Sequence, residues 1–275
     1  MPQRQPRLPL RSLIEWPRFM KRLLSRDDTP LPAPPYTMLA QIYDQIMLHV
    51  NYPRWARYIH ALLKAERCRP EMPLLDIGCG TGRFLEEMQR FGYYGDGCDP
   101  SGEMLEVARK RLPERSFFRD ALPAVEQVAP DHYPIITCLY DTMNYVLERS
   151  NFEQALAAVF HKLTSPGLFI FDVVSEAHCK HYFQHYSDSE VLSKDIAYTR
   201  ESFYEASTQS QYNWIRIYTP EGIFEEVHHQ RVYHYRDILE MIRQHSGFAV
   251  KAYEEFTLSR ANEGSGRVHF VLLKS

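Results

Sequence analysis

Short apolar runs and amphipathic segments alternate between residues 73 and 174. The apolar runs predict strands at 73–78, 94–99, 115–120, 133–141 and 168–174, and the segments between them predict helices at 83–91, 101–112 and 150–163. Ser101 stands in the N-cap position of the second of these helices. Strands that alternate with helices are typical of βαβ units, so we predict an α/β fold with a parallel sheet.

The rhythm changes after residue 180. Aromatic and β-branched residues gather in three stretches that predict antiparallel strands, at 195–207, 211–219 and 224–235. Alternation within the second stretch places Tyr212, Trp214 and Tyr218 on one face, which we interpret as the core of a small lobe rather than as a pocket wall. A helix at 236–248 and a pair of strands at 249–256 and 267–274 follow. We expect residues 185–234 to form an antiparallel β lid and residues 235–275 to complete the main sheet.

The beginning of the chain has a different composition. Residues 1–35 are basic and rich in proline, which predicts a flexible or extended leader. Within it, residues 12–24 could form a short amphipathic helix that docks on its own domain, on a partner or on a membrane surface, and docking on its own domain is the simplest interpretation. Residues 36–64 predict one or two helices, because apolar side chains recur there at helical spacing.

Composition excludes several classes of protein. The 275 residues carry a formal net charge of -3, which gives no overall attraction to nucleic acid or to an anionic membrane. No apolar run approaches the roughly 20 residues that span a bilayer, and no secretory signal is recognisable. The five cysteines are scattered without a C-x-x-C pair, which argues against a disulfide scaffold or a zinc ribbon. We therefore expect a cytoplasmic protein whose thiols are mostly core residues.

The stretch LLDIGCGTGRF, residues 74–84, carries the first sign of chemistry. Gly78, Gly80 and Gly82 stand where a strand turns into a helix, so the backbone can close on a ligand there. The spacing is not the G-x-G-x-x-G of a dinucleotide site, and no G-K-[ST] of a phosphate-binding loop follows. Asp76 would repel a pyrophosphate. A carboxylate beside bare amides suits a cofactor that has an amine and a carboxylate but no phosphate.

With these residues, the chain from 36 to 275 resembles the class I S-adenosylmethionine-dependent methyltransferases. The resemblance implies a seven-stranded, mostly parallel Rossmann-like sheet, with the cofactor-binding core and its N-terminal helical cover in residues 36–184 and the β-rich lid inserted after the fifth strand. It implies S-adenosyl-L-methionine as the cofactor and a cofactor site made of Asp76, Gly78, Cys79, Gly80, Gly82, Asp99, Asp120 and Ala121. Asp99 would bind the ribose hydroxyls and Asp120 would lie near the adenine; the alternatives are a helix-capping acid and a turn acid.

Two further stretches, CLYDTMNYV at 138–146 and YDQIM at 43–47, resemble a subgroup of small bacterial methyltransferases related to glycine and sarcosine N-methyltransferases. By this resemblance Tyr43 reaches the methionine end of the cofactor, unless it is a core aromatic. Asp141 and Asn144 follow the fourth strand on the acceptor side. The stretch HHQR resembles the same subgroup, and it offers His228, Gln230 and Arg231 to the acceptor, a solvated strand face being the alternative.

The expected activity is methyl transfer to a nitrogen or oxygen of a small molecule, with His228 or Asp141 as the base if the acceptor arrives protonated. We expect no metal, because His178, His181 and His185 have no acid cluster beside them. We expect no membrane span and no nucleic-acid partner, with a homodimer as an option. The rivals are an RNA or protein methyltransferase guided by the basic leader, a non-catalytic cofactor-binding regulatory subunit, and a nicotinamide enzyme.

Overall fold

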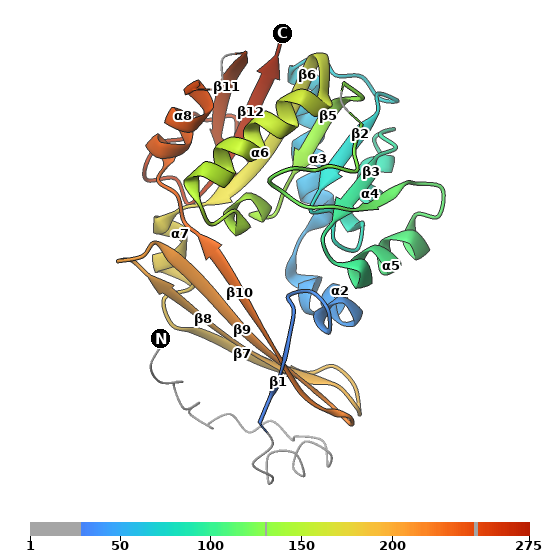
Figure 1. Ribbon diagram of the computed structural model, residues 1–275, viewed down its shortest axis with the longest axis vertical. Coiled ribbons are helices and arrows are strands. Elements are labelled where there is room, and N and C mark those ends of the chain that lie inside the picture. Colours follow the sequence, from blue (N-terminus) through green and yellow to red (C-terminus); the bar gives the residue numbers. More distant parts are fainter. Residues whose placement is uncertain (1–28, 130, 245–246) are drawn as a thin grey trace.

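The computed structural model describes residues 29–129, 131–244 and 247–275 and builds them into two sheets (Figure 1). The larger sheet has seven strands in the order β11-β12-β6-β5-β2-β3-β4. Its strands are β2 (Leu74–Ile77), β3 (Asp96–Asp99), β4 (Phe117–Arg119), β5 (Tyr133–Cys138), β6 (Leu163–Val174), β11 (Phe248–Glu254) and β12 (Arg267–Lys274). Strands β2 to β6 are parallel, and β12 runs antiparallel to both of its neighbours. The predicted α/β fold with a seven-stranded, mostly parallel sheet is confirmed.

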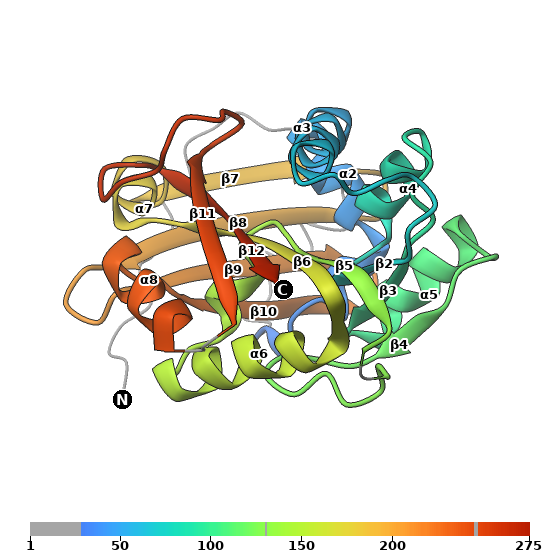
Figure 2. The ribbon, with the colours of Figure 1, turned by 90° about the horizontal axis from the view of Figure 1, so that it is seen from above.

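Helices cover both faces of this sheet. They are α3 (Tyr52–Ala65), α4 (Arg83–Gln89), α5 (Gly102–Arg111), α6 (Arg149–Lys162) and α8 (Tyr235–Gln244). Seen from above, α6 and α8 lie on one side of the strands and α3, α4 and α5 on the other (Figure 2). The predicted cap is present, since the Ser101 hydroxyl accepts a hydrogen bond from the Met104 amide at 3.1 Å. Because both faces are covered, the central strands are buried on both sides, and they are mostly apolar rather than alternating, with Asp76, Thr137 and Asp172 as buried polar exceptions.

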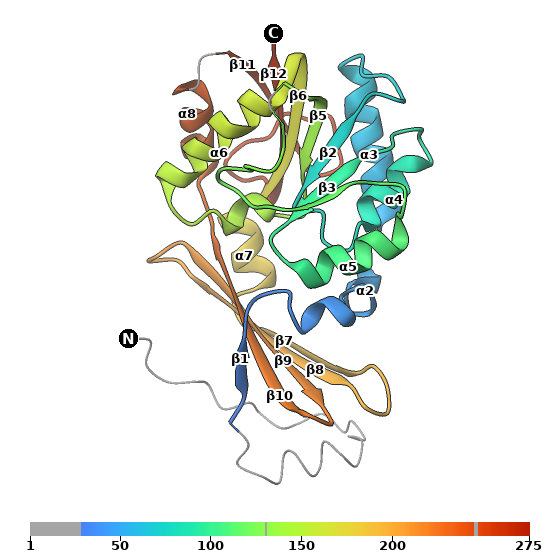
Figure 3. The same ribbon diagram turned by 45° about the vertical axis from the view of Figure 1, so that its right-hand side comes forward.

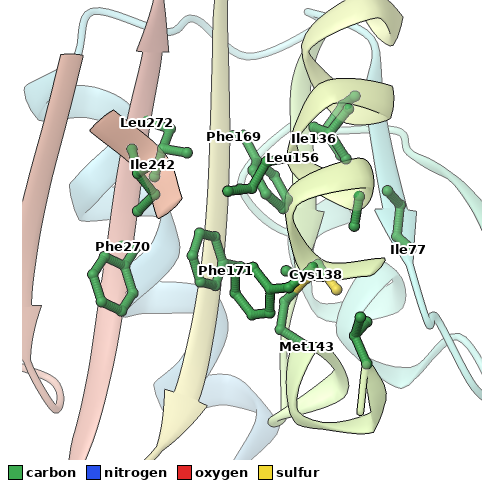
Figure 4. Close-up of a cluster of buried hydrophobic side chains, with 14 of the residues drawn as sticks. Ile77, Ile136, Cys138, Met143, Leu156, Phe169, Phe171, Ile242, Phe270 and Leu272 are labelled. Carbon is green, nitrogen blue, oxygen red and sulfur yellow. The ribbon is translucent and has the colours of Figure 1, made fainter. Parts of the chain in front are cut away.

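The two layers of core follow from the alternation of side chains along the strands. Phe169 and Phe171 point to the side of α6 and α8, where they stack on each other and Phe171 also stacks on Phe270 (Figure 4). Ile170, between them in sequence, points to the opposite cluster with α3 and α4. Four of the five cysteines, Cys79, Cys98, Cys138 and Cys179, are buried free thiols.

The second sheet contains five strands in the order β1-β10-β9-β8-β7. They are β1 (Leu31–Ala33), β7 (Tyr186–Val191), β8 (Ala197–Glu205), β9 (Ser210–Thr219) and β10 (Gly222–Arg231). Figures 1 and 3 show this sheet beyond the end of the core where the parallel strands finish. Neither β7 nor the short helix α7 (Glu176–Tyr182) before it was indicated by the sequence pattern. We call the sheet the lid.

Strand β1 comes from the proline-rich segment and pairs in parallel with β10. The sequence predicted flexible or extended backbone for residues 1–35; at Leu31–Ala33 the backbone is extended and paired. The predicted short helix at residues 12–24 lies outside the described residues. No described helix has the length and apolar character needed to cross a bilayer.

The segment between β1 and α3 covers the inner face of the lid. It consists of the short turns η1 (Leu39–Gln41), α2 (Tyr43–Ile46) and η2 (Met47–His49). Leu39, Ile42 and Ile46 from these turns pack on Ile215 and Ile217 of β9. The lobe core is therefore built from this face of β9. On its other face Tyr212 and Trp214 are only half-buried and stack on each other, so the prediction that they form the core was wrong; Tyr218 is buried there.

Candidate active site

The glycine loop joins β2 to α4 with a backbone that only glycine adopts easily. Gly78 and Gly80 have φ angles of 74° and 54°. A Cβ on Gly78 would lie 2.5 Å from the Thr142 side chain, which is closer than side-chain atoms approach. A Cβ on Gly80 would meet no atom within 4 Å. The first glycine therefore permits close packing, and the second leaves bare backbone facing open space.

That space is a cavity of about 860 Å³ at the carboxyl edge of the sheet. A volume of roughly 300–1,000 Å³ is typical of small-molecule and cofactor sites, which in parallel α/β sheets lie at this edge. The cavity is lined by residues 34–37, 76–81, 99–101, 119–123 and 145–148, and by Tyr43, Tyr52, Arg83 and Tyr140. Core, lid-facing turns and glycine loop all contribute to it.

Asp99, at the end of β3, is 7% exposed and lies in the cavity wall. Its two carboxylate oxygens accept hydrogen bonds from the Gly80 and Ser101 amides, both at 2.9 Å. Burial raises the pKa of Asp99 to about 6, although these two bonds oppose the shift. Asp99 thus organises the backbone around it and also faces the cavity, and its role at the ribose stays a prediction.

Asp76 and Cys79 lie deeper in the same wall. The Thr137 hydroxyl donates to Asp76 at 2.6 Å, and burial nevertheless raises the pKa of Asp76 to about 7. A cation in the cavity would favour the charged form of this carboxyl. Burial also raises the pKa of the Cys79 thiol well above its ordinary value, so Cys79 is a packing residue against Gly97 rather than a nucleophile.

Asp120, Ala121 and Tyr43 also line the cavity. The Asp120 carboxylate accepts bonds from the amides of Ala121, at 2.8 Å, and Gln127, at 2.6 Å, so it shapes the loop after β4 as a turn acid does. Tyr43 packs edge-on against Tyr36, with ring centroids 5.9 Å apart.

Asp141 does not line the cavity but belongs to a charged cluster behind it. Its carboxylate accepts bonds from Gln230 at 2.6 Å and from Arg267 at 3.0 Å. Arg267 also pairs with Asp172, which is fully buried. Burial raises the pKa of Asp172 to about 6, and Arg267 limits the rise. The expected acceptor-side acid is therefore engaged, together with Gln230, in joining the lid to the core.

Asn144 also connects the lid to the core. It is fully buried and absent from the cavity wall. Its side chain accepts from the Val174 amide at 3.1 Å and donates to the Arg231 carbonyl at 2.8 Å, which ties the end of β6 to β10. The Arg231 guanidinium points to the other face of the lid and donates to Thr208 and Gln209. The structure does not bring these two side chains to the site expected for them.

His228 lies one layer behind the cavity and is 2% exposed. Its Nδ1 is 3.0 Å from the Tyr145 hydroxyl, and its Nε2 is 3.3 Å from a carboxylate oxygen of Glu226. The Tyr145 hydroxyl is in turn 2.7 Å from the Tyr36 hydroxyl. Both tyrosines line the cavity. His228 thus reaches the site only through them.

A family model described as a methyltransferase domain matches residues 47–250. The chain belongs to the class I S-adenosylmethionine-dependent methyltransferases. Two relatives carry the description "Putative methyltransferase". A protein of Geobacillus sp. (strain WCH70) is 27% identical over 87% of this chain and 99% of its own length. YqeM of Bacillus subtilis (strain 168) is 26% identical over 87% of this chain and 97% of its own length. The nicotinamide enzyme and the non-catalytic subunit are thereby set aside.

Solved structures share the fold. A methyltransferase from Clostridium acetobutylicum ATCC 824 superposes with a TM-score of 0.72 at 21% identity, over 87% of this chain and 98% of that one. The sugar N-methyltransferase KedS8 from Streptoalloteichus sp ATCC 53650 superposes with a TM-score of 0.69 at 16% identity, over 84% and 92%. At these identities the likeness concerns the fold.

Several side chains of the cavity wall were missed from the sequence, among them Tyr36 and Tyr145, and so was Glu226, which lies behind them. A signal existed for Glu226, since it precedes His228 and Gln230 with the period of two that puts all three on one strand face. Tyr145 directly follows Asn144, and Asn144 was predicted from this stretch instead of Tyr145. Nothing local marked Tyr36, which follows two prolines at the edge of the leader.

Proposed function

We propose that this methyltransferase transfers the methyl group of S-adenosylmethionine to the nitrogen of a small amine bound in the same cavity. The observation that carries the proposal is the pairing of the Asp99 carboxylate with the bare backbone at Gly80 in one wall. Asp99 offers charged acceptors for ribose hydroxyls, and the space beside Gly80 admits a ligand where a Cβ would intrude. Asp120 and Ala121 would border the adenine, and Asp76 and Tyr43 the methionine end.

The bound cofactor supplies a methyl group on positively charged sulfur, which a nitrogen or oxygen lone pair attacks in line. The protein's task is then to hold the acceptor about 3 Å from that carbon and to keep water out. Residues 34–37 and Tyr145 close the cavity on the lid side. They therefore contribute both to holding the acceptor and to excluding water. Asp141, Asn144 and Gln230 hold the lid in place, and their effect on the acceptor is indirect.

The charge of the cavity favours an amine. Its wall carries five carboxyl groups and two guanidinium groups: Asp76, Asp99, Glu103, Asp120, Glu148, Arg83 and Arg119. An excess of negative charge attracts ammonium groups and repels acidic acceptors. Two structural neighbours, a sugar N-methyltransferase and the amino pentose methyltransferase CalS10, are named for acceptors of this kind. A cavity of this volume suits a small molecule rather than a macromolecule.

The test is an assay of S-adenosylhomocysteine formation by mass spectrometry. Glycine, sarcosine and D-glucosamine serve as amines, with catechol and D-glucose as acceptors that carry only hydroxyls. We expect methyl transfer to an amine and none in the Asp99→Ala variant. Transfer only to hydroxyls would refute the amine assignment. Transfer only to purified RNA or denatured protein, lost on deletion of residues 1–28, would establish the macromolecular rival instead.

A further inference from the structure

Four polar side chains form a continuous line from the lid to the cavity. Glu226 and His228 lie on the inner face of β10, with Glu226 fully buried. Tyr145 follows β5, and Tyr36 comes from the segment after β1. The separations between neighbouring atoms are 3.3 Å, 3.0 Å and 2.7 Å along the line. Only the two tyrosines line the cavity, so the line has one open end.

The charge of Glu226 favours one direction for the hydrogen bonds from His228 to Tyr36. As a carboxylate it only accepts, and it already receives the amides of Tyr36 and Met38 at 2.7 Å and of Leu39 at 2.9 Å. The His228 Nε2 lies 3.3 Å from a Glu226 oxygen without the geometry of a hydrogen bond. The negative charge of that carboxylate still favours the proton on Nε2, so that the bare Nδ1 accepts from the Tyr145 hydroxyl. The Tyr145 oxygen then accepts from Tyr36. One lone pair of the Tyr36 oxygen stays available on the cavity side.

Tyr36 is held in place at a cost. Its φ of 62° lies in the left-handed region, where a bulky residue is strained by roughly 1–3 kcal/mol. Glu226 binds its amide, and the Ser101 hydroxyl donates to its carbonyl at 2.8 Å. The Ser101 amide also binds Asp99. The strained residue is thus fixed between the lid and the acid that faces the cofactor, as expected of a group that acts on a ligand.

We propose that the Tyr36 hydroxyl takes the proton that the acceptor amine must lose, and that the positive charge passes by proton transfer through Tyr145 to His228. This rests on the proposed function. The acceptor's ammonium proton binds the Tyr36 oxygen, the proton of Tyr36 moves to Tyr145, and that of Tyr145 moves to Nδ1 of His228. The nitrogen's freed lone pair forms the bond to the methyl carbon as the carbon–sulfur bond breaks, with its electron pair remaining on sulfur. Glu226 stabilises the resulting imidazolium.

The transfer is concerted, because neither tyrosine ionises alone. Burial raises the pKa of Tyr36 and of Tyr145 well above 10, and the negative charge of Asp141 adds to both shifts. The groups that face His228 are Glu226 from its own strand, Tyr145 from the core and the Tyr36 ring, whose centroid is 4.6 Å away. Glu226 is the charged group among them. His228 is therefore where the positive charge comes to rest.

The first test needs no acceptor. Nitrogen-15 NMR of histidine-labelled protein bound to S-adenosylhomocysteine reports which ring nitrogen carries the proton. We expect His228 to be protonated on Nε2 at neutral pH, and Tyr145→Phe to shift its Nδ1 resonance. Tyr198→Phe, which removes a lid hydroxyl that bonds to Asp188 instead, is the matched control and should leave that resonance unchanged. Protonation of Nδ1 would overturn the proposal.

The second test uses whichever amine of the assay above reacts fastest. Tyr36→Phe and His228→Gln should each lower kcat/KM for the amine by roughly 100-fold, the usual range for loss of a proton acceptor. The double variant should fall no further, because the two act as one unit. Glutamine can still accept from Tyr145 but cannot take a proton, so the loss in His228→Gln should appear in kcat while cofactor affinity stays within about twofold.

The two proposals fail in different ways. If the wild-type protein methylates no amine, the proposed function is wrong whatever the histidine tautomer. If the wild type methylates an amine and His228→Gln keeps its kcat, the proton path is wrong and the function stands. Glu226→Gln should lower kcat/KM for the amine, since the imidazolium loses its counter-charge; an unchanged kcat/KM would contradict the role of Glu226.

Discussion

Replacing Asp99 with asparagine tests the cofactor site at its most defined group. The change keeps the shape of the side chain and removes its charge. In the wild type each carboxylate oxygen accepts one backbone amide, from Gly80 and from Ser101, and keeps further acceptor capacity for a ligand. Asparagine has one acceptor oxygen, so one of these two amides loses its partner. The substitution therefore acts on both the ligand and the fold.

The two effects have separate magnitudes. Hydrogen bonds to a charged acceptor contribute about 1.5–3 kcal/mol, so the affinity for S-adenosylhomocysteine should fall about 10- to 150-fold. One unpaired buried amide costs roughly 1–3 kcal/mol of folding free energy. The affinity of the wild type should also fall as the pH drops below about 6, where Asp99 becomes protonated, and this component should vanish in the variant.

Calorimetric titration with two ligands separates these effects. The first is S-adenosylhomocysteine and the second its analogue without ribose hydroxyls. The wild type should bind the analogue about as weakly as Asp99→Asn binds the complete ligand, and the variant should distinguish little between the two. If the variant loses the same free energy for both ligands, Asp99 acts only through the backbone, and our placement of the ribose is refuted.

Three further predictions concern other parts of the molecule. His269 is fully buried, and burial together with Arg267 lowers its pKa to about 3. Between pH 3 and 6.5 the unfolded chain therefore binds more protons than the folded one, so His269 lowers the free energy of unfolding as the pH falls. His269→Phe should recover about 2 kcal/mol between pH 7 and pH 5 in denaturant titrations, and the exposed control His161→Phe should not. Gly80→Ala should abolish cofactor binding in calorimetry with about 1 kcal/mol of destabilisation, since its side chain enters the cavity at positive φ. Asn144→Ala should cost roughly 2–4 kcal/mol in thermal unfolding and leave cofactor affinity unchanged.

Features that depend on neighbours in sequence could be predicted from it. The alternation of strands and helices, the Ser101 cap and the glycine loop are each decided within a few residues, and the structure has them where expected. The family followed from the same short stretches. Local patterns carry this information because helix capping, turn backbone and strand alternation are themselves local.

Contacts between distant segments could not be predicted in this way. Asp141 stands at the correct edge of the sheet, but its partner Arg267 lies on the last strand, and no spacing indicates their pairing. Strand β1 has no strand signal of its own, because proline is unfavourable in sheets, and it forms only because β10 offers a free edge. A sequence can show that a residue lies near the carboxyl edge of the sheet. It does not show that the side chain of this residue is already bound to another side chain.

The pairing of β1 with β10 also has a consequence for the order of folding. Tyr36, which lines the cavity, and Glu226, which binds its amide, are 190 positions apart along the chain. Contacts of such long range form late, since the intervening loop must first be ordered. During synthesis the Rossmann-like strands β2 to β6 leave the ribosome well before β10 exists. The lid-facing wall of the cavity is therefore the last part of it that can assemble in a newly made chain.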